Sequence, residues 1–129
     1  MEKKSIAQEI IALETSALEQ WNQGNPSGYL AIYSKDITYF DPFQEKRLDG
    51  FEAVEELYES IRGKVVVDKY EIINPVVETS HDMAVLSYNL ISYCGAETYK
   101  WNCTEVYRQE KEMQWKIVHN HWSLINMPK

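Results

Sequence analysis

Long β-forming segments dominate the second half of the chain and constrain its fold more than any other feature. Four of them follow one another: Tyr70–Glu78, Met83–Cys94, Glu97–Gln109 and Met113–Ile125. They are rich in β-branched and aromatic residues, and the breaks between them are only two to four residues long. Strands joined so tightly must be antiparallel, because a parallel pair needs a long crossover. The sequence therefore predicts a meander of long strands.

The first half has helical periodicity instead. Ser5 and Gln8 have the spacing of a capping box, and apolar residues then recur every three or four positions. The apolar positions of this stripe are Ile6, Ile10, Leu13, Ala17 and Trp21. We expect a one-sided helix here that ends at Gly24. Asn25-Pro26 then favours the start of a short second helix.

A strand and a third helix complete the first half. Residues 37–40, Ile-Thr-Tyr-Phe, are β-branched or aromatic and favour a strand. Asp49 and Glu52 repeat the capping spacing, and the apolar stripe that follows predicts a helix ending at Gly63.

Helices first and a strand meander afterwards predict an α+β fold. We expect three N-terminal helices packed on a strongly curved antiparallel sheet, forming a cone-like half-barrel. Three helices cannot fill so long a curved sheet, so an internal pocket is expected at its open end. A length of 129 residues suits one domain, spanning 1–129.

Composition limits the partners. Twenty acidic and thirteen basic residues give a formal net charge of −7, which disfavours nucleic acid and anionic membrane surfaces. Neither a signal-peptide core nor an apolar run of roughly 20 residues is present, so we expect a cytoplasmic protein that does not enter a membrane. Cys94 and Cys103 suit a reduced cytoplasm, although a hairpin disulfide between them stays open.

Asp41 is the first candidate for chemistry. It stands in SKDITYFDPFQ, among aromatic residues and directly before Pro42. A carboxylate that loses hydration beside aromatic rings becomes a usable base near neutral pH. The alternative is a turn residue whose side chain accepts backbone N–H bonds in the following loop.

Glu105 is the second candidate. It alternates along one strand face with Trp101, Cys103 and Tyr107. That face is apolar enough to point towards the helices, which makes Glu105 a buried or pocket-lining acid. If it shares the pocket with Asp41, repulsion keeps one of the two protonated and gives an acid–base pair. The alternatives are a bulge that exposes Glu105, or a salt bridge to Arg108 or Lys116.

Histidines and aromatic residues supply the remaining candidates. His119 and His121 share one face of the last strand and could shuttle protons, whereas a metal site lacks a third ligand and is not expected. The alternative is a histidine that hydrogen-bonds across the sheet. Five aromatic residues are candidates for the pocket wall, or equally for the core: Tyr29, Tyr33, Tyr39, Trp101 and Trp122. The sequence contains no phosphate-binding loop or nucleophile triad, so we expect no cofactor.

Four stretches of the sequence carry a resemblance to a known superfamily. They read WNQGNPSGYLAIYSKDITYFDP, RLDGFEAVEELYESI, IINPVV and QWKIVHNHWS, and together they run from Trp21 to Ser123. They resemble the nuclear transport factor 2-like superfamily, which includes ketosteroid isomerase, SnoaL-like cyclases and the association domain of calcium/calmodulin-dependent kinase II. The last stretch is most similar to that association domain and its bacterial relatives. The resemblance implies a cystatin-like fold and a homodimer formed through the sheet.

The resemblance also assigns roles to single residues. In ketosteroid isomerase the general base corresponds to Asp41, and the protonated acid of the oxyanion hole corresponds to Glu105. The tyrosine that completes that hole is replaced here by Ala17. In the kinase association domain basic residues bind small carboxylates, but the matching positions are Glu105 and Trp122. The resemblance therefore implies that this anion site is lost.

Together these observations predict a domain that binds a small, mostly apolar molecule. If it is an enzyme, we expect a cofactor-independent isomerase or cyclase in which Asp41 abstracts a proton next to a carbonyl. Glu105 or a tyrosine hydroxyl would then stabilise the enolate. A non-catalytic binding module and an oligomerisation module are the alternatives.

Overall fold

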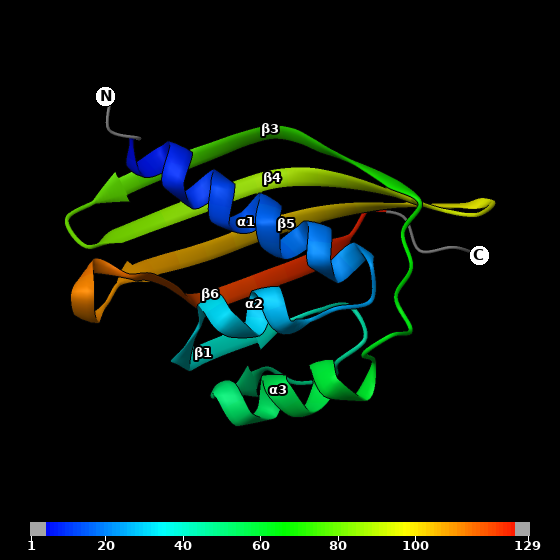
Figure 1. The fold of residues 1–129 in the computed structure, drawn as a ribbon, viewed down its shortest axis with the longest axis horizontal. Coiled ribbons are helices and arrows are strands. Elements are labelled where there is room, and N and C mark those ends of the chain that lie inside the picture. The colour runs from blue at the N-terminus through cyan, green and yellow to red at the C-terminus, as the bar shows by residue number, and fades with distance from the viewer. Residues whose placement is uncertain (1–4, 126–129) are drawn as a thin grey trace.

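The computed structural model describes residues 5–125, and this part of the chain contains three α-helices, six strands and one 3₁₀ helix. The helices are α1 (Ile6–Asn22), α2 (Ser27–Ile32), α3 (Phe51–Ser60) and the 3₁₀ helix η1 (Lys111–Met113). The strands are β1 (Tyr33–Phe40), β2 (Leu48–Asp49), β3 (Lys69–Ser80), β4 (Met83–Cys94), β5 (Glu97–Gln109) and β6 (Trp115–Leu124). Figure 1 shows α1 lying across the long strands, with α2 and α3 beside β1.

The predicted capping box of α1 is confirmed. The Ser5 hydroxyl accepts from the Gln8 backbone N–H at 3.1 Å, and the Gln8 side chain accepts from the Ser5 N–H at 2.9 Å. After α1, Gly24 has φ +85°, and an added Cβ would lie 3.0 Å from the Cα of Gly63. Glycine is therefore required here both for the backbone conformation and for the close approach of two loops.

The start of α3 differs from the prediction. Gly50 is the N-cap residue, with φ 92°, and no side chain caps the helix. Asp49 pairs instead with Arg47, at 2.6 Å between Nε and Oδ1. The Asp49 carboxylate thus takes part in an ion pair, and the predicted capping interaction is absent.

The predicted meander is confirmed, but the sheet is mixed rather than wholly antiparallel. Its strand order is β2-β1-β6-β5-β4-β3, and β3 to β6 pair antiparallel in sequence. β1 pairs parallel with β6. The tight-turn argument applies to consecutive strands, whereas these two are separated by most of the chain. The sheet stays open, with β2 and β3 at its edges.

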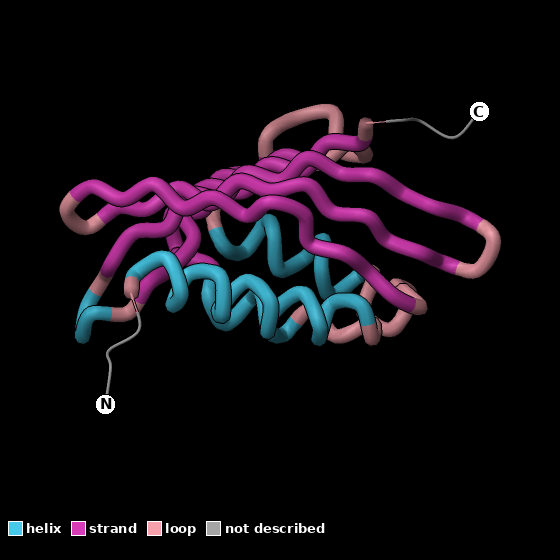
Figure 2. Tube along the Cα trace, turned by 90° about the horizontal axis from the view of Figure 1, so that it is seen from above, coloured by secondary structure: helices cyan, strands magenta, loops and turns pink. Residues whose placement is uncertain are grey.

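All three α-helices lie on one side of the curved sheet, as Figure 2 shows. The sheet face that they cover is called the inner face here, and the opposite one the outer face. Side chains along β4 alternate accordingly: Ala84, Leu86, Tyr88 and Leu90 are buried, while the residues between them are exposed. In the described part of the chain no helix is long and apolar enough to cross a membrane.

A one-residue irregularity in β6 decides which way the histidines point. Tyr107 of β5 pairs with Ile117, but the preceding Val106 pairs with His119, so β6 carries an extra residue at Val118. Ile117 is buried on the inner face, and after the bulge Asn120 is the buried residue. His119 and His121 therefore lie on the outer face.

The two cysteines do not pair. Cys94 faces Glu97 across the β4–β5 turn, whereas Cys103 faces Tyr88. Both thiols are free.

Candidate functional site

A cavity of about 620 Å³ opens between the inner face of the sheet and the helices. Eight of its twenty lining residues are aromatic: Trp21, Tyr29, Tyr39, Phe43, Tyr58, Tyr99, Trp101 and Trp122. The others are Leu18, Asn22, Asp41, Gln44, Leu57, Ile61, Val65, Val67, Leu90, Ser92, Cys94 and Leu124. We call this cavity the pocket. It has the size and the apolar character of small-molecule sites.

Asp41 follows β1 and lines the pocket. Its Oδ1 accepts from the Phe43 backbone N–H at 2.8 Å, and its Oδ2 accepts from the Tyr39 hydroxyl at 2.8 Å. Burial, the neighbouring Tyr58 and the charge of Asp41 raise the pKa of Tyr39. The Tyr39 hydroxyl therefore stays protonated and acts as a hydrogen-bond donor to Asp41. Asp41 is thus a turn residue and a pocket residue at once.

Four of the five predicted aromatic residues line the pocket. Trp101 and Trp122 lie with ring centroids 5.9 Å apart, and Phe43 lies 6.4 Å from Trp101. Tyr33 is the exception, since its hydroxyl lies in the core, 2.7 Å from the Tyr58 hydroxyl and 2.6 Å from Asn120 Oδ1. It borders a separate groove of about 740 Å³ beside the start of β1.

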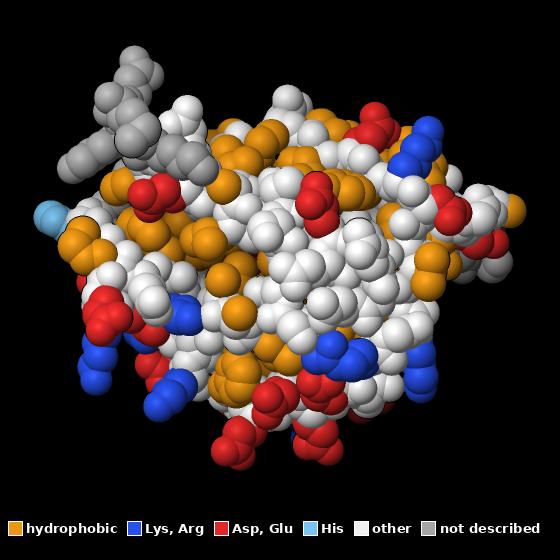
Figure 3. Space-filling model, in the orientation of Figure 1, with side chains coloured by type: hydrophobic (Ala, Val, Ile, Leu, Met, Phe, Trp, Pro, Cys, Tyr) orange, Lys and Arg blue, Asp and Glu red, His pale blue; other side chains and the backbone are white. Residues whose placement is uncertain are grey.

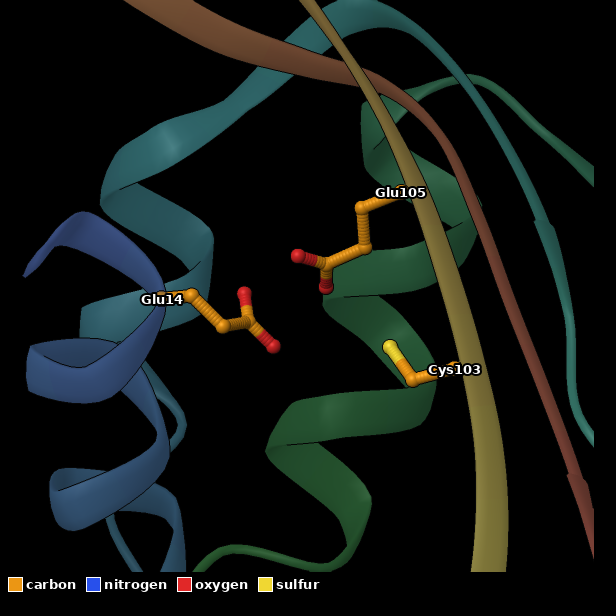
Figure 4. A group of neighbouring side chains, drawn as sticks. All are labelled: Glu14, Cys103 and Glu105. Carbon is orange, nitrogen blue, oxygen red and sulfur yellow. The ribbon is translucent and has the colours of Figure 1, made fainter. Parts of the chain in front are cut away.

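Glu105 faces inward, as the strand alternation predicts, but it is not among the residues that line the pocket. It is fully buried beside Glu14 of α1 and Cys103. One carboxylate oxygen of each acid and the Cys103 sulfur all lie within 4.8 Å of one another. Figure 4 shows the carboxyl groups of Glu14 and Glu105 pointing towards one another. We call Glu14, Cys103 and Glu105 the buried cluster.

Tyrosine hydroxyls surround the buried cluster. Tyr29 donates to Glu14 Oε2 at 2.8 Å, Tyr88 donates to the same oxygen, and Tyr107 lies 3.2 Å from Glu14 Oε1. Tyr107 is also 3.2 Å from Glu105 Oε1. The second oxygen of Glu105 has no hydrogen-bond partner among residues 5–125.

The electrostatics of the buried cluster favour a proton on Glu105. Burial raises the pKa of Glu105 well above its usual value, and the neighbouring Glu14 raises it further. Both effects stabilise the protonated form of Glu105, because two adjacent buried carboxylates repel one another. Burial and the same two acids also raise the pKa of the Cys103 thiol. Metal ligands must be deprotonated, so raised pKa values of the acid and the thiol disfavour metal binding here.

The predicted salt-bridge alternatives for Glu105 do not occur. Arg108 pairs with Asp36 at 2.9 Å and with Glu110. Lys116 donates to the carbonyl oxygen of Ala31 at 2.7 Å. These groups lie around the separate groove at the other end of the sheet.

His119 and His121 do not reach the pocket, because the β6 bulge places them on the outer face. His119 Nδ1 lies 2.7 Å from the Thr38 hydroxyl, so it hydrogen-bonds across the sheet. The Phe40 ring lies 5.6 Å from His119 and 5.0 Å from His121. Burial, and then His121, lowers the pKa of His119. The sheet therefore lies between these two imidazoles and the pocket.

The sequence did not identify Glu14 of the buried cluster or Asn22 of the pocket. Glu14 falls on the buried stripe of α1 between Ile10 and Ala17, so helical periodicity could have found it. Asn22 ends α1, is 6% exposed and lines the pocket, and its Nδ2 has no partner among the described residues. An amide at the end of a helix carries no periodic signal that separates it from a solvent-facing one.

The comparisons with known proteins agree with this architecture. The sequence model of the calcium/calmodulin dependent protein kinase II association domain matches residues 6–126. A solved structure from Parabacteroides distasonis ATCC 8503, which carries a provisional ketosteroid isomerase name, is similar with a TM-score of 0.87. The two sequences are 37% identical over 98% of this chain and 96% of that one.

More distant structures share the fold. A nuclear transport factor 2-like protein of unknown function from Pseudomonas putida KT2440 has a TM-score of 0.79 at 24% identity, covering 89% of this chain and 83% of that one. The calcium/calmodulin-dependent kinase II hub of S. rosetta has a TM-score of 0.78 at 16% identity, covering 95% and 99%. Among curated proteins none matches.

Proposed function

This chain belongs to the calcium/calmodulin dependent protein kinase II association domain family, and within that fold we propose that its pocket binds a small, mostly apolar molecule. The observation that carries the proposal is the pocket itself, about 620 Å³ and walled by eight aromatic side chains. Aromatic walls with a few convergent polar groups are what small-molecule sites use for grip and orientation. Asn22, Asp41, Gln44 and Ser92 supply the polar groups.

We propose ligand binding rather than catalysis as the function of the pocket. Proton transfer would fall to Asp41, the one carboxylate among the described residues that line the pocket. An enolate would need a donor at the pocket wall. The two donor positions that the resemblance implies do not supply one, because Glu105 is enclosed in the buried cluster and Ala17 has no hydroxyl. One missing oxyanion donor typically costs about 10²–10³ in rate. If chemistry does occur, Asp41→Asn must abolish turnover.

Two neighbouring valines allow a direct test of binding. Val67 lines the pocket, while Val66 beside it is 65% exposed. The neutral, apolar dye Nile red should bind the wild type saturably with a rise in fluorescence. Val67→Trp should reduce this affinity at least about tenfold by filling the pocket, and Val66→Trp should leave it unchanged. Equal binding by wild type and Val67→Trp, or no saturable binding by the wild type, would refute the proposal.

Self-association through the outer face is the second candidate function. Within residues 5–125 no element covers this face, and it carries Phe40 and Val85, which are 37% and 36% exposed, beside His119 and His121. The family takes its description from an association domain, and the hub named above is a fold neighbour. An uncovered sheet face with apolar side chains suits pairing with a second copy.

Light scattering after size-exclusion chromatography tests this candidate. We expect a particle at least twice the mass of the chain, and Phe40→Asp should shift it towards the monomer. Val66→Asp adds the same charge at an exposed apolar position on a loop and should leave the mass unchanged. A wild type that is monomeric at concentrations of about 100 μM would exclude stable self-association.

A further inference from the structure

The charge of the pocket wall restricts what the pocket can hold. Resting on the proposed binding function, we infer that the occupant is an organic cation, a protonated amine or quaternary ammonium group attached to an apolar body. Asp41 would serve as its counter-ion and the aromatic rings as its cage. This goes beyond binding of an apolar molecule, because it fixes the sign of the charge that the ligand carries.

The first argument is the balance of charge. Among the described residues that line the pocket, Asp41 carries a charge and none is Lys, Arg or His. Salt bridges occupy the nearby arginines, Arg47 with Asp49 and Arg62 with Glu59. An anionic ligand would meet a carboxylate of the same sign with no cationic side chain among the described lining residues to offset it, whereas a cationic ligand would complete an ion pair.

The second argument is the orientation of Asp41. One N–H and one O–H donor hold it, each on a different oxygen. Each carboxylate oxygen can accept a second hydrogen bond, so both retain an acceptor site for a ligand. Tyr39 is itself fixed, since its ring packs edge-on against Tyr58 with centroids 5.6 Å apart. The carboxylate is therefore held in place before any ligand arrives.

The third argument is the arrangement of aromatic rings beside Asp41. Phe43 donates its backbone N–H to Asp41, and its ring lies 6.4 Å from Trp101 at 75°. Trp101 in turn lies 5.9 Å from Trp122 at 84°. Successive rings at nearly right angles form corners that present the negative face of one ring beside the edge of the next. Such corners bind ammonium groups through cation–π contacts, for which Trp is the best residue.

The fourth argument is the field around the pocket. α3 contributes Leu57 and Tyr58 to the wall, and its outward side carries the exposed Glu52, Glu55 and Glu56. Figure 3 shows acidic side chains gathered along the edge of the molecule where Figure 1 places α3. With a net charge of −7, this field attracts cations towards the pocket and repels anions.

Three compounds that differ in the head group test the inference by isothermal titration calorimetry. They are 3-phenylpropyl-trimethylammonium, the neutral 3-phenylpropan-1-ol and the anion 4-phenylbutyrate. We expect the ammonium compound to bind at least about tenfold tighter than the alcohol, and the carboxylate to bind weakest. Asp41→Asn should remove the preference for the ammonium compound and leave the affinity for the alcohol within about twofold. Asn keeps an oxygen that can accept from Phe43.

The control variant is Glu45→Gln, which removes the same charge at an exposed position four residues further on. It should retain the preference for the ammonium compound. Equal affinities for ammonium and alcohol, a preference for the carboxylate, or Nile red binding without ammonium binding would each overturn the charge assignment while the binding function stands. If neither Nile red nor any of the three compounds binds, both proposals fail.

Discussion

The pocket and the buried cluster occupy the same layer between α1 and the sheet, and both combine acids with tyrosines, yet they differ in what is left unpaired. In the buried cluster, three phenols donate to Glu14, and the second oxygen of Glu105, which has no partner within residues 5–125, is enclosed in the core, away from the pocket. In the pocket, Asp41 has two donors and space on its open side, and the Asn22 amide nitrogen has no partner among the described residues. Burial of an acid therefore does not by itself mark a functional site. Free hydrogen-bonding capacity beside a void is the better indicator.

The difference is one of architecture as well as chemistry. The hydroxyls that reach Glu14 come from α2, β4 and β5, so the buried cluster ties α1 to the rest of the domain. In the pocket, by contrast, both donors to Asp41 come from residues only two positions away in the chain. We expect substitutions in the buried cluster to change stability, and substitutions in the pocket to change binding.

The largest effect should follow from Glu14→Ala. It removes the acceptor of three buried phenols and leaves a cavity, which we expect to lower the free energy of unfolding by at least about 4 kcal/mol. Urea denaturation followed by circular dichroism measures this change. Glu9→Ala, on the exposed side of the same helix, should cost less than about 0.5 kcal/mol.

Glu14→Gln serves if the alanine variant does not fold. It keeps the shape and one acceptor oxygen, so we expect a smaller loss of about 2 kcal/mol. A Glu14→Gln variant as stable as the wild type would show that the phenols do not depend on the carboxylate, and the contrast between the two regions would collapse.

The next effect is a change in pH dependence caused by Glu105→Gln. The pKa of Glu105 is raised in the folded state, so folded protein keeps a proton that the unfolded chain releases above its usual value of 4.5. The stability contributed by Glu105 is thus fully present below that pH and is lost as pH rises through the folded-state pKa, at about 1.4 kcal/mol per pH unit. Gln carries no such proton.

Unfolding free energies between pH 4 and pH 8 check this prediction. The difference between Glu105→Gln and wild type should shift in favour of the variant as pH increases above about 4.5. Glu78→Gln, on the exposed side of β3, controls for the loss of one acid. A constant difference between Glu105→Gln and wild type across this range would mean that Glu105 is not the group holding the proton.

Local rules were sufficient for most of the fold. Capping and periodicity placed α1, short breaks placed the meander, and alternation along β5 correctly turned Glu105 inward. The parallel pairing of β1 with β6 lies outside such rules, because it joins segments that are distant in the chain. The faces of His119 and His121 depend on a single extra residue at Val118, which period-two reasoning cannot anticipate.

The site was harder to predict than the fold. Asp41 follows the end of β1 and lines the pocket, as the sequence predicted. Whether Glu105 shares that pocket depends on where along the sheet α1 lies and which helix residue meets it. Glu14 occupies that place, and its pairing with Glu105 is a tertiary contact between residues 91 positions apart.

A smaller effect should distinguish two tyrosines of β1. Tyr33→Phe removes a hydroxyl that contacts Tyr58 and Asn120 in the core, and we expect a loss of about 2 kcal/mol in unfolding free energy. Tyr39→Phe removes only the donor to the half-exposed Asp41 and should cost about 1 kcal/mol or less. Urea denaturation of both variants measures the difference. An equal or reversed order would mean that the pocket is as tightly coupled to folding as the core.

The smallest effect on stability should come from Asn22→Leu. Leucine has a similar volume and removes an amide whose nitrogen is buried without a partner among residues 5–125, so the free energy of unfolding should stay unchanged or rise by up to about 1 kcal/mol. Thermal denaturation without ligand checks this. Nile red, which needs no amide, should still bind. A loss greater than about 1 kcal/mol would show that the amide holds the end of α1 in place, and Asn22 would then belong with the structural residues rather than with the pocket.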